Sequence, residues 1–557
     1  MNRNISTISI CLLLSGLLTA TLTGCSKTPT VPEVYERTEE PLSIDPDYTN
    51  TLFPVNIAPP SFQINNPGDE CVTILSGKDQ QIVLAGKEVA PPIKLWKSLC
   101  ENSAGSQITV TVYLRSGETW RRVQDIFFSI SADKIDPWLT YRLIEPGYDH
   151  FGTMRLAQRR IETFDEKPFF DGNAVEGTCA NCHTAQNRHP NNMLFHTRGN
   201  YGGTILVRDG RAEKIGTQSP DTGLQAVYPA WHPTSDLIVF STNKTFQIFH
   251  AAGANKIEVM DAISDLLLYD VNQNSFTPIT NTPLLLETFP SWSPDGRTLY
   301  YCAADISSLP LNKEKTEPVW RECYESVRYA LYRRTFSPET RAFGSPELIW
   351  DAPAEGKSVV HPRVSPDGRF LIVTVSNDGT FPIWHPESDL FLIDLTTGQR
   401  RSMTEINSDQ SESYHSWDSS GRWLIFVSRR DDTLYSRVYI THIDENGNGS
   451  KPFILPQRRV AEDRRRMKSY NLPEPMVAPV PVSLGTLTRV ITLKSPRRAV
   501  YTEQSPPVSK QSQSIPAQPQ STKTTSVGKI SVLTDKKSTS TDKMSASADK
   551  MSMSVNK

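Results

Sequence analysis

The chain has 557 residues, so its length alone predicts about two to four domains. It carries 59 basic and 61 acidic residues, for a formal net charge of −2. A balance this close to neutral gives no electrostatic reason to expect a nucleic-acid partner. The composition is that of an ordinary soluble protein, apart from its 41 prolines.

Residues 1–24 have the pattern of an export signal. The apolar run Ile8 to Leu22 is too short for a stable transmembrane helix. It ends in Leu22-Thr23-Gly24-Cys25, which resembles the lipobox of bacterial lipoproteins. The resemblance implies cleavage before Cys25 and a lipid anchor on it, and Ser26 favours the outer membrane. We therefore expect a periplasmic body, with surface exposure left open. The alternative is an ordinary secretory signal.

Two segments precede the main repeats. Residues 25–48 contain Pro, Thr and Glu without periodicity, which predicts a tether. Residues 49–136 contain short β-prone runs separated by Gly, Asn and Pro. The run from Gln107 to Leu114 alternates polar and apolar residues, as a half-buried strand does. We expect an immunoglobulin-type β-sandwich here, with a spacer or docking role.

Residues 138–480 repeat one pattern. The clearest copy is Phe289-Pro-Ser-Trp-Ser-Pro-Asp-Gly296, and related copies begin at Tyr228, His361 and Tyr414. Each copy precedes an apolar strand, and repeats of roughly 50 to 70 residues indicate four-stranded propeller blades. The Pro-Asp-Gly turn needs a positive φ at its glycine.

These copies resemble the WD40-like repeats of the TolB propeller family. With two further blades inferred between residues 138 and 216, we expect an all-β fold containing a six-bladed β-propeller. Five or seven blades remain open. Because propellers have many functions, the resemblance alone implies partner binding only in general terms.

One motif inside this region carries chemistry. Cys179-Ala-Asn-Cys182-His183 has the C-x-x-C-H spacing of a c-type haem attachment site. Two thiols add to the porphyrin vinyl groups, and the adjacent imidazole binds iron. We expect Cys179 and Cys182 to hold haem c and His183 to be the proximal ligand, in a loop between blades at the channel mouth. A disulfide, a redox dithiol or half a zinc site are alternatives.

The distal side of such a haem has several candidate ligands. Met193, His196 and His189 follow the motif closely, and the position could also be open. A Met ligand raises the potential, whereas an open site permits small-ligand chemistry. Four more histidines lie near the repeats: His232, His361, His385 and His415. They either cluster at the channel mouth or bind loop backbone, and binding to loop backbone is the favoured interpretation.

Other features are interpreted structurally. Four cysteines remain after Cys11 is removed with the export signal and lipid and haem are assigned, with Cys71–Cys100 and Cys302–Cys323 as the local pairings, although spacing cannot prove a disulfide. The segment 444–449 resembles the start of a calcium loop but lacks its final Glu, so a hairpin turn is expected. The basic residues of 458–468 predict a solvated surface.

The last segment, 482–557, is rich in Ser, Thr and Lys, which predicts a disordered tail. The lipobox, C-x-x-C-H motif and TolB-like repeats together resemble a group of uncharacterised Bacteroidetes lipoproteins. The first hypothesis is a membrane-anchored haem c protein that exchanges electrons with a redox or envelope protein partner. The second is a haem-free scaffold that binds a protein or an envelope polymer. A haem peroxidase or reductase is the weaker third.

Overall fold

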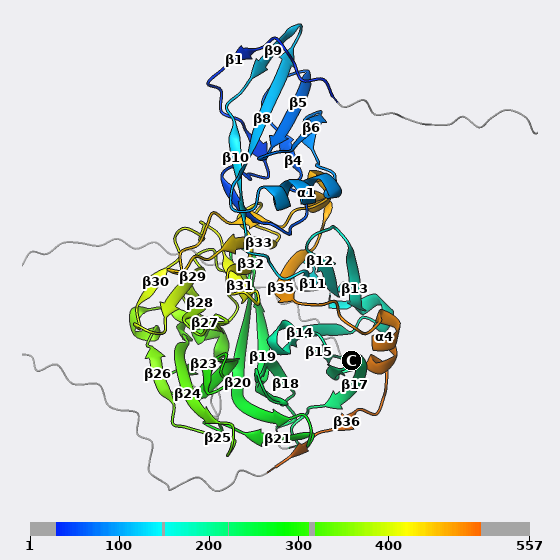
Figure 1. Cartoon of the computed structure of the whole chain (residues 1–557). Helices are drawn as coiled ribbons and strands as arrows, with labels where there is room; N and C mark the ends of the chain where they lie inside the picture. The colour runs from blue at the N-terminus through cyan, green and yellow to red at the C-terminus, as the bar shows by residue number, and fades with distance from the viewer. Residues whose placement is uncertain (1–28, 148–150, 221, 311–317, 503–557) are drawn as a thin grey trace, which may run out of the picture. The chain divides into compact units, whose positions relative to one another are not determined.

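The computed structural model describes residues 29–147, 151–220, 222–310 and 318–502. Figure 1 traces them from blue to orange. The export signal and Cys25 lie outside the described residues, as do residues 503–557. No helix within the described ranges is long and apolar enough to cross a bilayer.

The N-terminal part contains two β-sheets and one helix. A seven-stranded sheet has the order β1-β9-β8-β10-β3, with β5 paired to β8 and β6 paired to β5, and a three-stranded sheet has the order β2-β4-β7. The helix α1 (Ile93–Asn102) was not expected, and it buries Trp96 and Leu99. The strands are β1 (Glu36–Arg37), β2 (Ile44–Asp45), β3 (Thr51–Pro54), β4 (Phe62–Ile64), β5 (Glu70–Ser76), β6 (Gln81–Ala85), β7 (Glu88–Val89), β8 (Gln107–Ser116), β9 (Thr119–Arg122) and β10 (Ile126–Ser131).

The segment predicted as a tether is structured where it is described. Its strand β1 pairs with β9, and β2 pairs with β4. Leu42 and Tyr48 are buried, at 6% and 1% exposure. The N-terminal sheets therefore begin well before residue 49, because this stretch supplies strand partners and core side chains.

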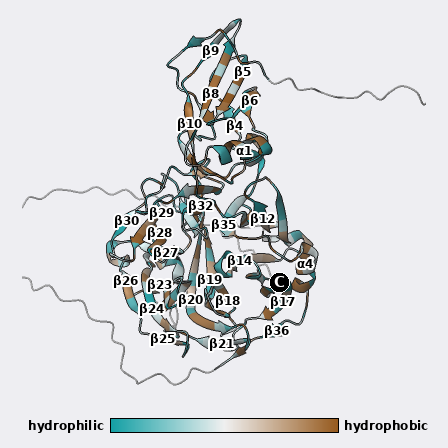
Figure 2. Ribbon diagram, in the orientation of Figure 1, coloured by the Kyte–Doolittle hydropathy of each residue, from teal (hydrophilic) through white to brown (hydrophobic). Residues whose placement is uncertain are grey.

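Residues 138–501 form six small sheets of four or five mostly antiparallel strands, each resembling a propeller blade. Figure 2 shows apolar residues in brown along their strands. The first three sheets contain β11 (Trp138–Ile144), β12 (Arg155–Arg160), β13 (Glu166–Asp171) and β35 (Ser469–Met476); β14 (Cys179–Ala185), β15 (Asn192–Arg198), β16 (Gly203–Arg208), β17 (Arg211–Gly216) and β36 (Arg497–Arg498); and β18 (Ala226–Trp231), β19 (Leu237–Phe249), β20 (Ile257–Asp270), β21 (Ser275–Pro278) and β37 (Val500–Tyr501).

The next three sheets follow in chain order. They contain β22 (Leu285–Trp292), β23 (Thr298–Asp305), β24 (Ala330–Ser337), β25 (Ala342–Phe343) and β26 (Glu347–Trp350); β27 (Ser358–Val364), β28 (Phe370–Ser376), β29 (Asp389–Asp394) and β30 (Arg400–Ser402); and β31 (Glu412–Trp417), β32 (Trp423–Ser428), β33 (Arg437–His442) and β34 (Phe453–Ile454). Two short helices, α2 (Trp320–Cys323) and α3 (Val460–Arg465), lie in connecting segments.

The innermost strands contact one another in a closed series. β14 contacts β18, and the series continues through β22, β27 and β31 to β35, which contacts β14. The strand β35 comes from the C-terminal side of the repeats yet pairs antiparallel with β11, the first strand of this region. The first sheet is therefore built from both ends of this region.

The repeat motif connects neighbouring sheets. Trp292 Nε1 donates a hydrogen bond to the Ala230 carbonyl at 3.2 Å, and Trp417 Nε1 donates to the Arg363 carbonyl at 3.1 Å. Gly296 ends its turn at φ +68°, the left-handed conformation that the motif requires. The motif tryptophans thus join neighbouring sheets.

The disordered tail was predicted to begin at residue 482, but the folded part of the chain continues past that residue. Residues 484–491 form helix α4 (Leu484–Ile491), whose Leu487 and Ile491 are buried. Beyond it, β36 pairs parallel with β17, and β37 pairs parallel with β21. These strands extend two of the small sheets, so the stretch up to residue 502 belongs to the folded part despite its polar composition.

Two smaller expectations are also resolved. Every cysteine among the described residues is a free thiol, so the local pairings Cys71–Cys100 and Cys302–Cys323 do not form disulfides. The calcium-like segment is a hairpin turn between β33 and β34, in which the Asp444 carboxylate accepts hydrogen bonds from the backbone of Asn446 and Asn448.

Candidate ligand cavity at the innermost strands

The C-x-x-C-H motif lies in strand β14, not in a loop between blades as predicted. Its first residues pair with β15, Cys179 with Arg198 and Asn181 with His196. The register then shifts, and Cys182 takes a φ of 55°. A β-bulge at Cys182 and His183 therefore interrupts the strand and re-aims both side chains.

The same bulge occurs on all six innermost strands. In each, the register shifts at a non-glycine residue whose φ lies between 47° and 55°: Cys182, Tyr228, Phe289, His361, Tyr414 and Leu472. Such a φ is uncommon outside glycine, so six equivalent cases mark a feature of the fold. The sequence Cys182-His-Thr-Ala185 is thus the structural counterpart of Tyr228-Pro-Ala-Trp231.

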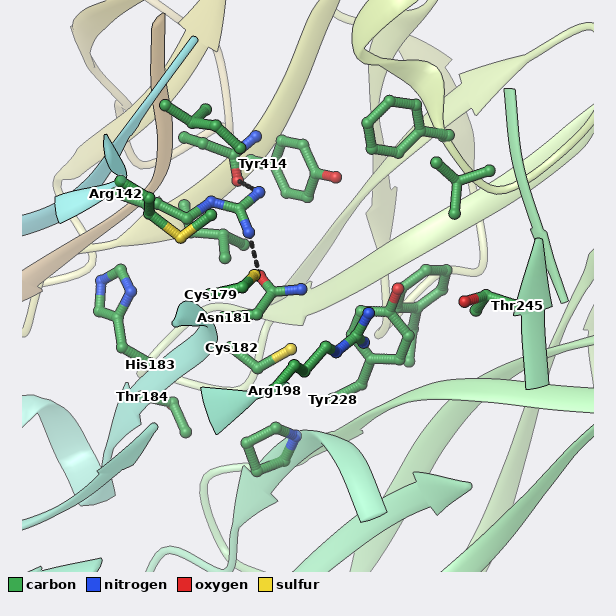
Figure 3. Close-up of a pocket in the computed structure, with 18 of the residues that line it drawn as sticks. Arg142, Cys179, Asn181, Cys182, His183, Thr184, Arg198, Tyr228, Thr245 and Tyr414 are labelled. Atoms are coloured by element: carbon green, nitrogen blue, oxygen red, sulfur yellow. Dashed lines mark hydrogen bonds between the residues drawn. The ribbon is translucent and has the colours of Figure 1, made fainter. Parts of the chain in front are cut away.

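All six bulge residues line one cavity of about 430 Å³ (Figure 3). Four of them are Tyr, Phe or His, and the ring centroids of His361 lie 4.5 Å from Phe289 and 4.6 Å from Tyr414. Cys179, His183, Arg142 and Arg198 also line the cavity. The motif therefore lies where residues from all six sheets meet.

The surroundings of the two motif cysteines keep their thiols protonated. Cys179 is half-buried, and Cys182 is 6% exposed. Burial raises the pKa of both thiols, although the guanidinium groups of Arg142 and Arg198 act in the opposite direction. Neither thiol is paired in a disulfide. Both are therefore available for covalent chemistry on a group inside the cavity.

His183 is a buried imidazole without normal hydrogen bonds. Its side chain is 2% exposed and packs edge-on to Phe169, with ring centroids 6.2 Å apart. Burial and the nearby Arg142 lower its pKa to about 3, and the Thr140 backbone opposes this only in part. Neither ring nitrogen makes a hydrogen bond of normal geometry within the described structure. The imidazole is thus neutral, with both nitrogens lacking partners.

The motif side chains diverge across the strand. Figure 3 shows the Cys182 sulfur directed toward Arg198 and Tyr228, whereas the His183 ring extends to the other side of β14. Such divergence is normal for consecutive residues of a strand. Both residues nevertheless contribute to the cavity lining.

Two arginines give the cavity wall a positive character. Arg142 is 5% exposed and donates hydrogen bonds to the side chains of Asn181 and Asn471, the latter at 3.0 Å. Arg198 makes no ion pair among the described residues, but its charge acts on Asp261, whose pKa burial raises to about 7. A ligand with an acidic group could be held at this wall.

The three candidate distal ligands do not line the cavity. Met193 is fully buried in the core, His196 Nδ1 lies 3.3 Å from Thr204 Oγ1, and His189 is exposed. Two other residues line it, Met154 and His361. Met154 was not expected from the sequence, whereas His361 was one of the four histidines for which a cluster at the channel mouth was the less favoured interpretation. Only their positions in the fold identify these two residues. Met154 lies next to the sheet that contains the motif, and His361 lies at a bulge.

The remaining repeat histidines bind protein groups. His232 Nε2 lies 3.0 Å from the Gly296 carbonyl, and His415 Nε2 lies 2.9 Å from the Ile372 carbonyl. The His232 bond matches the favoured interpretation of loop-backbone bonding, whereas His415 binds the backbone of strand β28. His385 instead contacts two carboxylates, Glu258 and Glu387.

No protein-family model matches the chain, and no curated protein matches it. Solved structures give distant similarity to β-propeller domains. TolB from Acinetobacter baumannii is 12% identical over 66% of this chain and 78% of its own, with a TM-score of 0.39. Prolyl oligopeptidase B from Galerina marginata is 10% identical over 62% and 42%, with a TM-score of 0.31. Another prolyl endopeptidase structure is 13% identical over 57% and 42%, with a TM-score of 0.30. The chain is thus distantly similar in structure to the propellers of TolB and prolyl oligopeptidase.

Proposed function

We propose that the protein is a membrane-anchored periplasmic electron carrier with one covalent haem c in the cavity at the innermost strands. The observation that carries this proposal is His183: a neutral, buried imidazole with two unpartnered nitrogens, directly after two free thiols. An unpartnered buried nitrogen costs free energy unless a ligand satisfies it, and a neutral imidazole is the form that binds metal.

The residues present fit the group by their donor chemistry. Cys179 and Cys182 would form the thioether links, and His183 would bind the iron. When bound, haem supplies reversible single-electron chemistry at its iron. Arg198 offers a cation at the cavity wall for an acidic group of the ligand, and four bulge residues add aromatic rings to the lining.

We further propose that His361, in place of Met193, His196 and His189, would be a second residue to hold the iron. Its Nδ1 is buried without a hydrogen-bond partner, and it lines the cavity from β27. In the series of innermost strands, β27 is three positions from β14 in either direction. The proposed architecture is a six-bladed propeller preceded by a β-sandwich, with lipid on Cys25 and a redox or envelope protein as partner.

The test is spectroscopic. The full chain is expressed with a cytochrome c maturation system, purified and denatured, and a pyridine haemochrome spectrum is recorded. We expect a c-type α-band that survives denaturation and is absent from Cys179→Ala/Cys182→Ala. The matched control is Cys71→Ala/Cys100→Ala, which removes two other buried thiols and should keep the band. No band in cells that mature another cytochrome would reject the haem proposal.

One observation favours a second function, a haem-free binding propeller. Because the Cys182 sulfur and the His183 ring extend to opposite sides of β14, the aromatic and cationic wall could instead hold a side chain or sugar of a partner. In that case, Arg198→Ala weakens capture of an envelope protein or polymer, and the cysteine variant binds normally.

A further inference from the structure

A second group of potential ligands lies outside the cysteine motif. Glu258 belongs to β20, whereas Asp378 and His385 lie between β28 and β29. One ligand atom of each residue lies within 4.8 Å of those of the other two. The group joins the extended β19–β20 hairpin to a different sheet, where the Thr380 hydroxyl also donates to the Val259 carbonyl at 2.9 Å.

The histidine is oriented as metal-binding histidines are. His385 is 5% exposed, and its Nδ1 lies 2.9 Å from the Glu387 carboxylate. Its Nε2 contacts Glu258 Oε1. A carboxylate on one ring nitrogen fixes the tautomer and leaves the other nitrogen to bind a cation, which is the usual outer arrangement of a metal site.

The glutamate provides an independent observation. Glu258 is 1% exposed, and its Oε2 is buried without a hydrogen-bond partner in the described structure. Its Oε1 accepts a hydrogen bond from Asn255 Nδ2 at 2.8 Å, and Asn255 Oδ1 is another buried oxygen without a partner. Asn255 turns its Nδ2, not this oxygen, toward the group, since Nδ2 also lies 3.4 Å from His385 Nε2. The unsatisfied Glu258 oxygen beside a histidine nitrogen is therefore the sign of an incomplete coordination set, because buried acceptors without partners are rare.

The charge of the group is also unbalanced. Three carboxylates, those of Glu258, Asp378 and Glu387, surround the single imidazole of His385. The Arg328 guanidinium also acts on Asp378. A further cation would offset the remaining negative charge, because buried carboxylates are costly without compensation.

We propose that Glu258, Asp378 and His385 bind one divalent transition-metal ion. The set combines one nitrogen with carboxylate oxygens. It suits Zn²⁺ or Mn²⁺ better than Ca²⁺, which takes six to eight oxygens. The ion would tie the β19–β20 hairpin to the β28–β29 connection. Val259 and Phe381, which lie beside these ligands in sequence, line the cavity.

The experiment is metal titration of the full chain after chelator treatment and dialysis, by calorimetry with ZnCl₂, MnCl₂ and CaCl₂ in parallel. We expect one site for Zn²⁺ and for Mn²⁺, and at least tenfold weaker binding of Ca²⁺. Glu258→Gln and Asp378→Asn should abolish the site, and Glu387→Gln should weaken it by about 10- to 100-fold. Asp378 is only half-buried, so its variant remains usable if Glu258→Gln does not fold.

Two controls separate this site from other donors. Glu287→Gln changes another carboxylate that is 1% exposed with an unpartnered oxygen, and it should bind metal normally. Cys179→Ala/Cys182→Ala should also retain the site. The proposal is overturned if the folded wild-type chain binds neither ion, if Asp378→Asn binds like wild type, or if the cysteine variant alone loses the site. In those cases His385 is an imidazolium held by two glutamates.

Discussion

Gly296, in the repeat turn, allows the free-energy cost of one steric contact to be measured separately. A methyl group there would lie 2.4 Å from both Cε1 and Nε2 of His232, whose ring is fully buried and hydrogen-bonded to the Gly296 carbonyl at 3.0 Å. A φ of +68° costs an L residue about 1–2 kcal/mol. Moving the ring and losing its hydrogen bond add about 1–3 kcal/mol. Gly296→Ala should therefore lower the free energy of unfolding by about 2–5 kcal/mol.

Gly398 is the matched control. Its φ is +73°, but a Cβ there would meet nothing within 4 Å. Gly398→Ala should cost only the backbone term of about 1–2 kcal/mol. Urea unfolding, followed by the fluorescence of the 10 tryptophans, measures both variants. Equal midpoints for the two would refute the reasoning, because the contact with His232 would then contribute nothing.

Three further predictions follow from buried groups. Burial raises the pKa of Asp261 from 3.8 to about 7, so the contribution of this carboxyl to stability is full below pH 3.8 and is lost as the pH rises through 7. Asp261→Asn should therefore flatten this part of the pH–stability curve. An unchanged slope in the variant would count against the raised pKa. Arg430→Met should lower the free energy of unfolding by about 3 kcal/mol, measured by thermal melts, because it leaves the fully buried Glu412 without its 2.8 Å ion pair. A loss of stability below about 1 kcal/mol would contradict this prediction. His361→Ala should change the absorption spectrum of the haem-loaded chain, whereas an identical spectrum would exclude His361 as iron ligand.

Much of the sheet arrangement could be predicted from repeated residues. The turn around Gly296 and the tryptophans before such turns identified four sheets, because a tight turn followed by an apolar strand constrains sequence strongly. The strands at 138–216 were found by hydrophobic pattern alone. Helix α1 and the strands β36 and β37 were missed. Short edge strands carry little pattern, and only tertiary pairing defines them.

The motif residues of the site were predicted from the sequence, but their arrangement in space was not. The spacing of Cys179, Cys182 and His183 identified the motif, yet it was assigned to a loop because strands were expected both before and after it. Its place at a bulge equivalent to Tyr228 depends on strand pairing. Likewise, nothing local marks Met154 as a cavity residue, since its position is set by contacts between sheets.

The pairing of β35 with β11 has a consequence for the order of assembly. Asn471 and Leu472, on that returning strand, form part of the cavity wall. During synthesis, more than 300 residues separate β11 from its partner β35, since Trp138 pairs with Met476. The cavity is therefore completed only when β35, the last of the innermost strands to be made, docks. Any occupant of the cavity can be enclosed late, after the innermost strands of the other five sheets have been made.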